Sequence, residues 1–260
     1  MNKNIFIIIL FFLLSTNFSI ILLGNGTAGS NASHESRYIV DMPTAGLLKR
    51  LNCAVSGQTI ANGGFVFDAT IPLFNILNVG ISYGGDGILG SEHLVMQKIP
   101  GFHIKARVLN ETKAAPAIVM GINTQGKERY LSSKKRFEQL SPGVYVAASK
   151  SFSWILGNIA LHAGMNYSFE DSDNRGMNLY FGAEHTIYKY VTAVLEINPN
   201  LNDNDSSIWK NSKSLMINTA IRVGIAENIT AELQLKDLLK NSKYSKEFAR
   251  LVGLDVILKF

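Results

Sequence analysis

The alternation of apolar and polar residues is the feature that most restricts the fold of this chain. From Leu51 onward, apolar residues recur at every second position in segments of about ten residues, separated by clusters of Gly, Asn, Asp and Ser. In one segment Phe65 and Phe67 fall on one face, whereas Asp68 and Thr70 fall on the other. A period of two places alternate side chains on opposite faces of a β-strand. The chain is therefore predicted to be all-β, with many antiparallel strands.

Twelve segments follow this rule, and their even number predicts an antiparallel up-and-down barrel of about 12 strands. The alternation is least regular in 49–58 and 115–124, where Ala and Gly blur it, so a count of ten strands stays open. The predicted strands are 49–58, 64–74, 76–84, 101–109, 115–124, 143–152, 157–168, 177–186, 189–198, 214–224, 228–238 and 248–260.

The connections between these segments alternate in length. Every second connection of a closed barrel lies at the same end, so the long loops gather at one end and the short turns at the other. This asymmetry is typical of bacterial outer-membrane barrels. The short connections lie around Asn75 and at 110–114, 153–156, 187–188 and 225–227; the long ones are 85–100, 125–142, 169–176, 199–213 and 239–247, and 59–63 alone is short among the latter.

Alternation alone also fits a soluble barrel with its apolar face inward. Two features favour the opposite orientation, with lipid outside. The strands match the about 9 to 11 residues that cross a bilayer when tilted, and aromatic residues gather near both strand ends, as at two membrane interfaces. These aromatic residues are Phe65, Tyr83, Phe102, Tyr145, Tyr167 and Phe248 at the long-loop end, and Phe74, Phe152, Trp154, Tyr188, Tyr190 and Phe260 at the short-turn end.

The composition excludes several other classes of protein. Charged residues make up 17% of the chain, below the roughly 25% of a soluble domain. The one continuous apolar run lies at the N-terminus, which argues against a helical multi-span membrane protein. The lone Cys53 excludes a fold stapled by internal disulfides.

Residues 1–26 have the pattern of a secretory signal peptide. Lys3 begins an apolar stretch, and small residues follow it. A retained membrane anchor is the alternative, although the polar residues 15–17 interrupt the stretch. After cleavage, residues 27–48 are predicted to form a short periplasmic N-terminal segment, and residues 49–260 an outer-membrane β-barrel.

The last strand, GLDVILKF, ends the chain on an aromatic residue. With the signal peptide and the loop asymmetry, it resembles bacterial outer-membrane β-barrel proteins. The resemblance implies that Val256, Leu258 and Phe260 form a C-terminal insertion signal read by the barrel insertion machinery. It also implies contact with outer-membrane lipids in a diderm bacterium, after secretion across the inner membrane.

A second resemblance is carried by RYIVDMPTAGLLKR, LFNILNVGISYGG, GVYVAASKSF and LHAGMNYSFED. These segments are similar to uncharacterised barrels related to the exopolysaccharide-associated outer-membrane family. This chain is shorter than the larger members, and none of the segments defines a reaction.

Charged side chains on the polar face are the candidate functional residues, because they would line the lumen. A turn centred near Ala226 places Arg222 opposite Thr230 and diagonal to Glu232. Since the lumen would be only modestly wider than that of an eight-stranded barrel, paired charges should narrow or close it. The predicted lumen residues are Asp68, His103, Lys105, Arg107, Glu184, Glu196, Arg222, Glu232, Lys236 and Asp255.

No catalytic site, cofactor or metal site is predicted. The loop GGDGILG contains the letters of a dinucleotide fingerprint, but another strand follows it where the fingerprint needs a helix. The histidines lack metal-ligand spacing. The serines lack a recognisable spacing to a base; those considered are Ser149, Ser151, Ser153 and Ser168.

Two polar loops carry possible binding signals. The basic loop KERYLSSKKRFEQ is expected to face lipid head groups or water, and its interleaved glutamates argue against nucleic acid as a partner. Asp203 and Asp205 have a spacing seen in calcium loops but lack the glycine and glutamate of an EF-hand. Turn chemistry is therefore the expected role of both aspartates.

The favoured function is a narrow channel or transport-type barrel with a lumen of mixed charge. The alternatives are a structural or envelope-assembly barrel linked to surface polysaccharide export and, less favoured, a barrel enzyme acting on envelope lipids. The transported species, a small solute or a polysaccharide, is left open.

Overall fold

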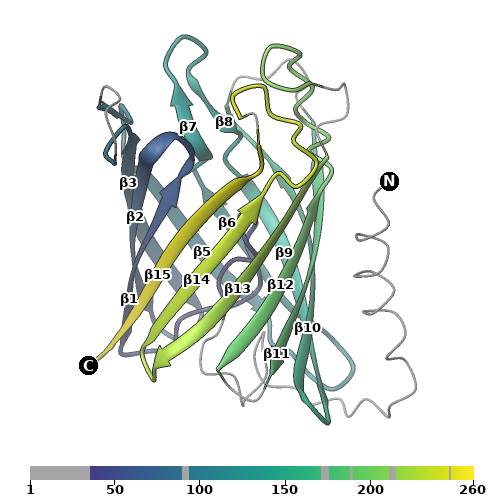
Figure 1. The fold of residues 1–260 in the computed structure, drawn as a ribbon. Coiled ribbons are helices and arrows are strands. Elements are labelled where there is room, and N and C mark those ends of the chain that lie inside the picture. The colour runs from purple at the N-terminus through teal and green to yellow at the C-terminus, as the bar shows by residue number, and fades with distance from the viewer. Residues whose placement is uncertain (1–35, 90–93, 171–175, 188–189, 211–214, 246) are drawn as a thin grey trace.

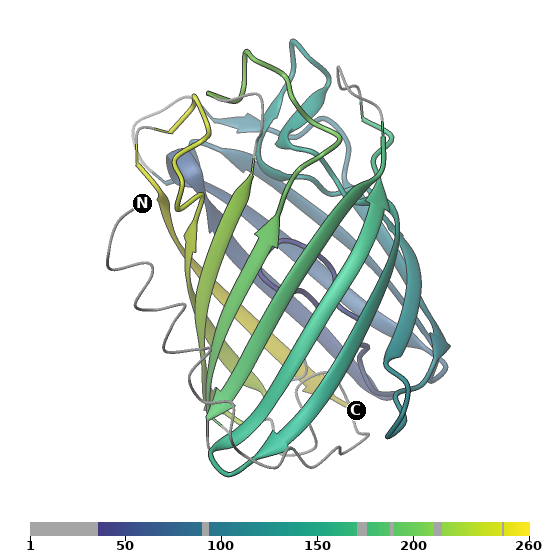
Figure 2. The ribbon, with the colours of Figure 1, turned by 90° about the vertical axis from the view of Figure 1, so that its right-hand side faces the viewer.

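A single antiparallel sheet closes on itself in the computed structural model, which describes residues 36–89, 94–170, 176–187, 190–210, 215–245 and 247–260. The first strand pairs with both the second and the last strand, which completes the ring. Figures 1 and 2 show the tilted wall. Within the described residues the wall strands are β1 (Asn52–Ile60), β2 (Gly64–Leu73), β3 (Leu77–Asp86), β5 (Gly101–Leu109), β6 (Ala117–Asn123), β9 (Gly143–Trp154), β10 (Gly157–Tyr167), β11 (Asn178–Ile187), β12 (Val191–Asn198), β13 (Met216–Ala226), β14 (Ile229–Lys236) and β15 (Ala249–Lys259).

Each predicted strand overlaps one of these wall strands. The two least regular segments, 49–58 and 115–124, correspond to β1 and β6, so the barrel has twelve strands, not ten. Closure leaves no unpaired edge along the described wall, which is what a bilayer requires of a β-structure. Of the helices in the described residues, none is long and apolar enough to span a membrane.

The two faces of the wall differ as the alternation predicts. In β10, His162 and Asn166 are buried inside the barrel, whereas Leu161 and Met165 are 49% and 46% exposed on its outside. Large apolar side chains are exposed on other strands as well, among them Phe67, Ile81, Phe102, Ile104, Met120, Val144, Phe181, Ile221, Leu233, Val252 and Leu254. An apolar surface of this extent is unfavourable in water and suits the hydrocarbon layer of a membrane.

The predicted aromatic belts are right for several residues and wrong for Tyr145. Phe74, Tyr190 and Phe260 are exposed near the short turns, and Tyr83, Phe102 and Tyr167 near the long loops. Tyr145 is buried and points inward, because Val144 and Val146 take the outward positions of β9. Its ring lies against Gly121, where a Cβ would come within 2.6 Å of it. The side chains of Trp154 and Tyr188 lie outside the described residues.

The long loops fold over one end of the barrel as a layer that we call the cap, formed by residues 125–142, 199–210 and 237–245. It contains the hairpin of β7 (Lys127–Leu131) and β8 (Arg136–Gln139), at the top of Figure 1. Leu131, Ile208, Trp209 and Met216 form a small apolar cluster there. A bridge between Trp209 and Ser242 joins two of the loops.

Two basic side chains of the loop are paired with aspartates of the cap and do not simply face lipid head groups or water, which corrects the prediction for them. Arg136 is 1% exposed and forms an ion pair with Asp203, and Lys134 forms one with Asp205. Asp205 also accepts hydrogen bonds from the backbone N–H and the hydroxyl of Ser207, at 2.8 and 2.7 Å, in a local turn. Lys134 and Arg136 thus tie the two loops to each other, and Asp205 combines turn chemistry with ion pairing.

The end of β15 allows the insertion-signal prediction to be tested. Phe260 is 78% exposed on the outside, whereas the Lys259 ammonium lies 3.6 Å from Glu227. We expect Phe260→Asp to reduce the yield of folded barrel much more than Lys259→Asp, because only the first places a charge at the lipid interface. The measurement is the fraction of heat-modifiable protein on a gel. Equal yields would contradict the interpretation of Phe260 as part of the signal.

The cap should lose stability as the pH rises. Burial raises the pKa of Glu138 to about 7; the nearby Glu128 and Asp237 add to this, and a hydrogen bond from Ser242 opposes it. The folded cap therefore holds a proton that an unfolded loop with an ordinary glutamate pKa releases. Cap stability should fall between about pH 4.5 and 7, by at most about 3 kcal/mol.

Fluorescence of the buried Trp209, in a Trp154→Phe background, reports cap opening by denaturant. We expect a lower midpoint at pH 8 than at pH 5 in this background, and a much smaller difference after Glu138→Gln is added. Glu247→Gln, at an exposed carboxylate in the same end of the barrel, is the control. A pH dependence that persists in Glu138→Gln would assign it to another group.

Candidate functional site

Residues 36–48 lie inside the barrel, and we call this segment the plug. Sequence analysis predicted a short periplasmic N-terminal segment for 27–48. The described part of it, residues 36–48, runs through the lumen, as Figures 1 and 2 show. Ile39, Asp41 and Thr44 are completely buried. The predicted signal peptide lies outside the described residues and stays a prediction.

The plug is a tight hairpin. Tyr38 pairs with Pro43 across it. The Ile39 N–H donates to the Met42 carbonyl at 2.8 Å, and the Thr44 N–H to the Arg37 carbonyl at 3.1 Å. These bonds leave the N–H groups at the tip of the hairpin without partners in the plug itself. The tip must therefore bond to the wall, because an unpaired buried N–H costs about 1 to 3 kcal/mol.

Glu196 of β12 accepts the N–H groups of the hairpin tip. Its Oε2 receives hydrogen bonds from Val40, Asp41 and Met42 at 3.0, 2.9 and 2.8 Å. Three successive N–H groups around one oxygen form a nest for an anion. The other oxygen of Glu196 accepts from Asn218 at 2.9 Å. One predicted lumen charge thus anchors the tip of the plug.

A second anchor joins the plug to the cap. The ammonium group of Lys236 lies 2.7 Å from Asp41 and 3.3 Å from Glu128 of β7. Asn218 also donates to Asp41, at 3.2 Å. Glu128 in turn accepts the backbone N–H of Ala61 at 2.8 Å. Asp41 therefore links the plug, the wall and the cap in one network.

Arg222 of β13 forms the third anchor. Its guanidinium donates to the Tyr38 carbonyl at 3.0 Å, to the Ile39 carbonyl, and to Ser36 Oγ at 2.8 Å. It also lies 3.0 Å from Glu184 and 3.2 Å from Glu232. Arg222 therefore holds the plug from one side while two carboxylates hold Arg222.

The register of Arg222 differs from the prediction. It lies directly opposite Glu232, and Thr230 pairs with Gly224 instead. An irregularity in the pairing between Gly224 and Ala226 accounts for the difference, because the extra residue shifts the facing positions. The predicted Arg222–Glu232 contact exists, but as a direct cross-strand pair.

The opposite side of the plug is held by hydrogen bonds from β5, β9 and β11. The Lys105 ammonium donates to the carbonyls of Arg37, Thr44 and Gly46 at 2.8, 3.1 and 3.2 Å. The Tyr180 hydroxyl donates to the Pro43 carbonyl at 2.9 Å. Lys105 thus caps the carbonyls of both arms of the hairpin.

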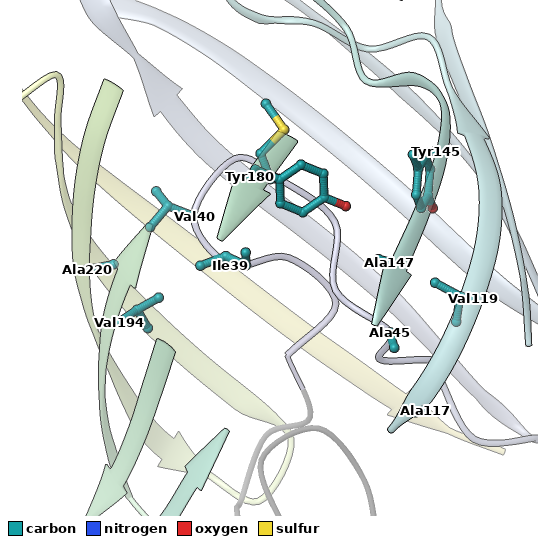
Figure 3. Close-up of a cluster of buried hydrophobic side chains, with 11 residues drawn as sticks. Ile39, Val40, Ala45, Ala117, Val119, Tyr145, Ala147, Tyr180, Val194 and Ala220 are labelled. Carbon is teal, nitrogen blue, oxygen red and sulfur yellow. The ribbon is translucent and has the colours of Figure 1, made fainter. Parts of the chain in front are cut away.

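Apolar packing completes the fit between plug and wall. Figure 3 shows Ile39 and Val40 beside Val194 and Ala220, with Ala45 on the side of Val119 and Ala147. Close approach requires a glycine in β11: a Cβ at Gly182 would lie 2.6 Å from Ile39 Cγ2. Small wall residues therefore make room for the side chains of the plug.

Ser149, His162 and Glu184 come together although their spacing in the sequence predicts no such contact. Ser149 Oγ lies 2.8 Å from His162 Nδ1, and His162 Nε2 lies 3.6 Å from Glu184. Ser149 Oγ also accepts the N–H of Ala45 at 2.9 Å, and all three side chains are buried beside the plug. A nucleophile must reach its substrate, so in this arrangement the three residues hold the plug.

The remaining predicted lumen residues lie along the same inner face. Asp68 Oδ2 lies 3.2 Å from His103 Nδ1, and Asp255 forms an ion pair with Arg37 of the plug. Arg107 is half-buried near the short turns, where its N–H donates to the Ile76 carbonyl. The structure thus brings nine of the ten predicted residues to the plug or to its neighbours, and places Arg107 apart from them.

Several lumen residues were missed by sequence analysis. They are Asp41 in the plug, Asn218 and Tyr180 on the wall, and Lys127 and Glu128 at the foot of the cap. One feature of the sequence could have indicated that the plug is buried. The segment is more apolar than a linker in water needs to be, because it contains Tyr38, Ile39, Val40, Met42, Leu47 and Leu48.

Comparison with known proteins gives matches at the level of structure. No protein-family model matches the chain, and no curated protein matches it. The solved "KdgM porin" matches with a TM-score of 0.51 and 11% identity over 79% of this chain and 98% of that chain. A second solved structure, "KdgM porin in complex with disordered oligogalacturonate", gives a TM-score of 0.50 with the same identity and coverage. A "NanC porin" gives 0.44 at 8% identity, over 80% of this chain and 98% of that chain. The chain therefore has the twelve-stranded barrel fold of the KdgM porin structures.

Proposed function

We propose that this protein is a narrow outer-membrane channel whose lumen is closed by its own N-terminal hairpin. The observation that carries the proposal is that the inside of the barrel is polar and charged, and that a chain segment fills it through side-chain contacts with the wall. A barrel of this kind contains a path for water and solutes once the segment moves.

The contacts suit a plug that can leave the lumen. Ion pairs such as Lys236–Asp41 hold it, but the cost of removing charges from water offsets much of the attraction in a buried ion pair. When water enters the lumen, each charged group is hydrated again and regains the free energy of hydration that it lost in the ion pair. The free energy that separates the closed and open states is therefore smaller than the number of contacts suggests.

The location belongs to the proposal as well. The apolar outer surface and the barrel fold shared with KdgM support the outer membrane of a diderm bacterium, reached by secretion and by the barrel insertion machinery. The lipids of that membrane would be the partners of the outer wall.

Transport of a small solute is better supported than export of a polysaccharide. The resemblance of residues 37–50 to exopolysaccharide-associated barrels motivated the second function. An extended polymer would need residues 36–48 to leave the whole length of the lumen, whereas a small solute needs only part of that space. A phospholipid-directed enzyme is less favoured still, because the Ser149–His162–Glu184 group faces the plug and not the lipid.

The wild-type protein should show weak or no conductance in a planar bilayer, and Arg222→Ala with Glu232→Ala should increase it measurably. The double change removes the bonds of Arg222 to the Tyr38 and Ile39 carbonyls without leaving Glu232 as an unpaired charge. Glu184 loses Arg222 but keeps the hydrogen bond from Ser36 at 2.7 Å. The control is Lys240→Ala with Glu247→Ala, which removes an exposed pair and the same charges. Large, porin-like conductance in the wild type would refute the closed state, and an unchanged double variant would refute the role of this pair.

Deleting residues 37–46 should give a larger conductance than the double substitution. The deletion removes the segment that fills the lumen, and the polar inner wall can then take up water. Single-channel recordings should be compared only for samples that retain heat-modifiable migration, which shows that the barrel has folded. A folded deletion variant that conducts no better than the wild type would place the barrier elsewhere, for example in the cap.

A further inference from the structure

A polar cavity remains between the plug and one side of the barrel. Arg37 and Tyr38 of the plug border it, and Gln58, Asp68 and Gln234 border it from β1, β2 and β14. The centres of water molecules can occupy about 100 Å³ of this space. One water needs roughly 10 to 15 Å³ of such volume, so the cavity has room for several waters, or for a solute about as large as one sugar ring.

The charged side chains that line the cavity balance in sign: three are basic and three are acidic, namely Arg37, Lys127, Arg222, Asp68, Glu232 and Asp255. Arg37 is paired with Asp255, and Arg222 with Glu232 at 3.2 Å. Asp68 faces the imidazole of His103 at 3.2 Å and accepts a hydrogen bond from the Thr70 hydroxyl at 2.8 Å. Lys127 lies 4.0 Å from Asp41 of the plug. A solute with a net charge would compete with these pairs and would lose hydration without gaining an unpaired counter-charge. The lining therefore favours a polar solute without net charge.

The lining also offers hydrogen-bonding capacity that the protein does not use. Gln234 is 2% exposed, and its Oε1 is a buried acceptor without a hydrogen-bond partner among the described residues. This oxygen is covered in the structure, so a donor in the cavity reaches it once the Gln234 amide turns towards the cavity. An unsatisfied buried acceptor costs about 1 to 3 kcal/mol, which favours that turn when a donor is present. The hydroxyl group of a solute is such a donor. The amide side chain of Gln58 lines the same cavity.

A glycine leaves the wall open between these amides. A Cβ at Gly253 of β15 would stand 3.5 Å from the Cβ of Glu232, and 3.8 Å from both Gln234 Nε2 and the Cβ of Gln58. These are ordinary van der Waals distances, so a side chain fits the wall at this position and would extend into the cavity. Gly253 thus provides a way to fill the cavity without disturbing the barrel.

We propose that the cavity beside the plug is a binding site for a small, uncharged, polyhydroxylated solute, a neutral monosaccharide, with Gln234 as an acceptor for one of its hydroxyl groups. The proposal rests on the proposed channel function and names the class of solute that the lumen recognises. The proposed solute also differs in charge from the ligand of the KdgM structure in complex with oligogalacturonate, which is a chain of acidic sugars.

Saturation-transfer NMR on the protein purified in detergent tests the site, with D-galactose, D-glucose and D-galacturonate as probes. We expect saturable binding of at least one neutral hexose. Galacturonate, which carries a carboxylate on the same ring as galactose, should bind at least tenfold more weakly than that hexose.

Three variants locate the site. Gly253→Val should abolish saturable binding by filling the cavity. Gln234→Leu, which removes the unpartnered acceptor, should weaken binding several-fold. Gln139→Leu is the matched control and should leave binding unchanged, because Gln139 is an equally buried amide with unpartnered atoms but lies in the cap.

The outcomes also separate this site from the channel function. No saturable binding of either hexose, binding that survives Gly253→Val, or galacturonate binding as tight as that of the hexose would overturn the site. If Arg222→Ala with Glu232→Ala conducts while no hexose binds, the site alone fails. If a hexose binds at this cavity but neither that variant nor the plug deletion conducts, the channel function alone fails.

Discussion

Buried charge that must find a partner is the constraint on which the inside of this barrel depends. A closed sheet of twelve strands is slightly too wide for its own side chains to fill, and its inner face is polar because its outer face must be apolar. The plug meets both needs. It occupies the lumen, and its backbone N–H and carbonyl groups satisfy Glu196, Lys105 and Arg222 on the wall.

This arrangement explains why the lumen is sensitive to single changes and yet suited to opening. Truncating Arg222 alone would leave Glu184 and Glu232 without their cation, and an unpaired buried charge costs about 3 to 5 kcal/mol. Moving the whole plug aside is different, because water can then reach every group at once. A lumen built from such pairs is therefore strongly destabilised by the loss of one charged side chain, but much less by movement of the whole plug.

The local sequence pattern was sufficient to predict the strands of the wall and the face on which each side chain lies, because the alternation of apolar and polar residues is visible within any few residues of a strand. The identity of most lumen charges followed from that phase. Tyr145 was wrongly predicted to lie at the membrane interface, because an aromatic residue near a strand end is compatible with the interface and with the barrel interior. Its contact with Gly121, which lies on another strand, is not visible in the local sequence. The offset of Arg222 came from an irregularity at 224–226, which leaves no periodic trace.

The plug was beyond such reasoning because its partners are distant in the sequence. Neither the three N–H groups that meet Glu196 nor the aspartate that meets Lys236 belongs to a motif. The basic loop was misassigned for the same reason: Arg136 finds Asp203 across a separation of 67 residues. Contacts of this kind become visible only once the barrel has brought distant strands together.

The same distances fix an order of assembly. Ser36 meets Arg222 across 186 residues, and Asp41 meets Lys236 across 195, so these contacts of the plug form only once β13 and β14 are in the wall. It precedes β1, whose pairing with β15 closes the ring. The segment thus precedes every wall strand in the chain, but its set of contacts is complete only when the last strands of the wall are in place.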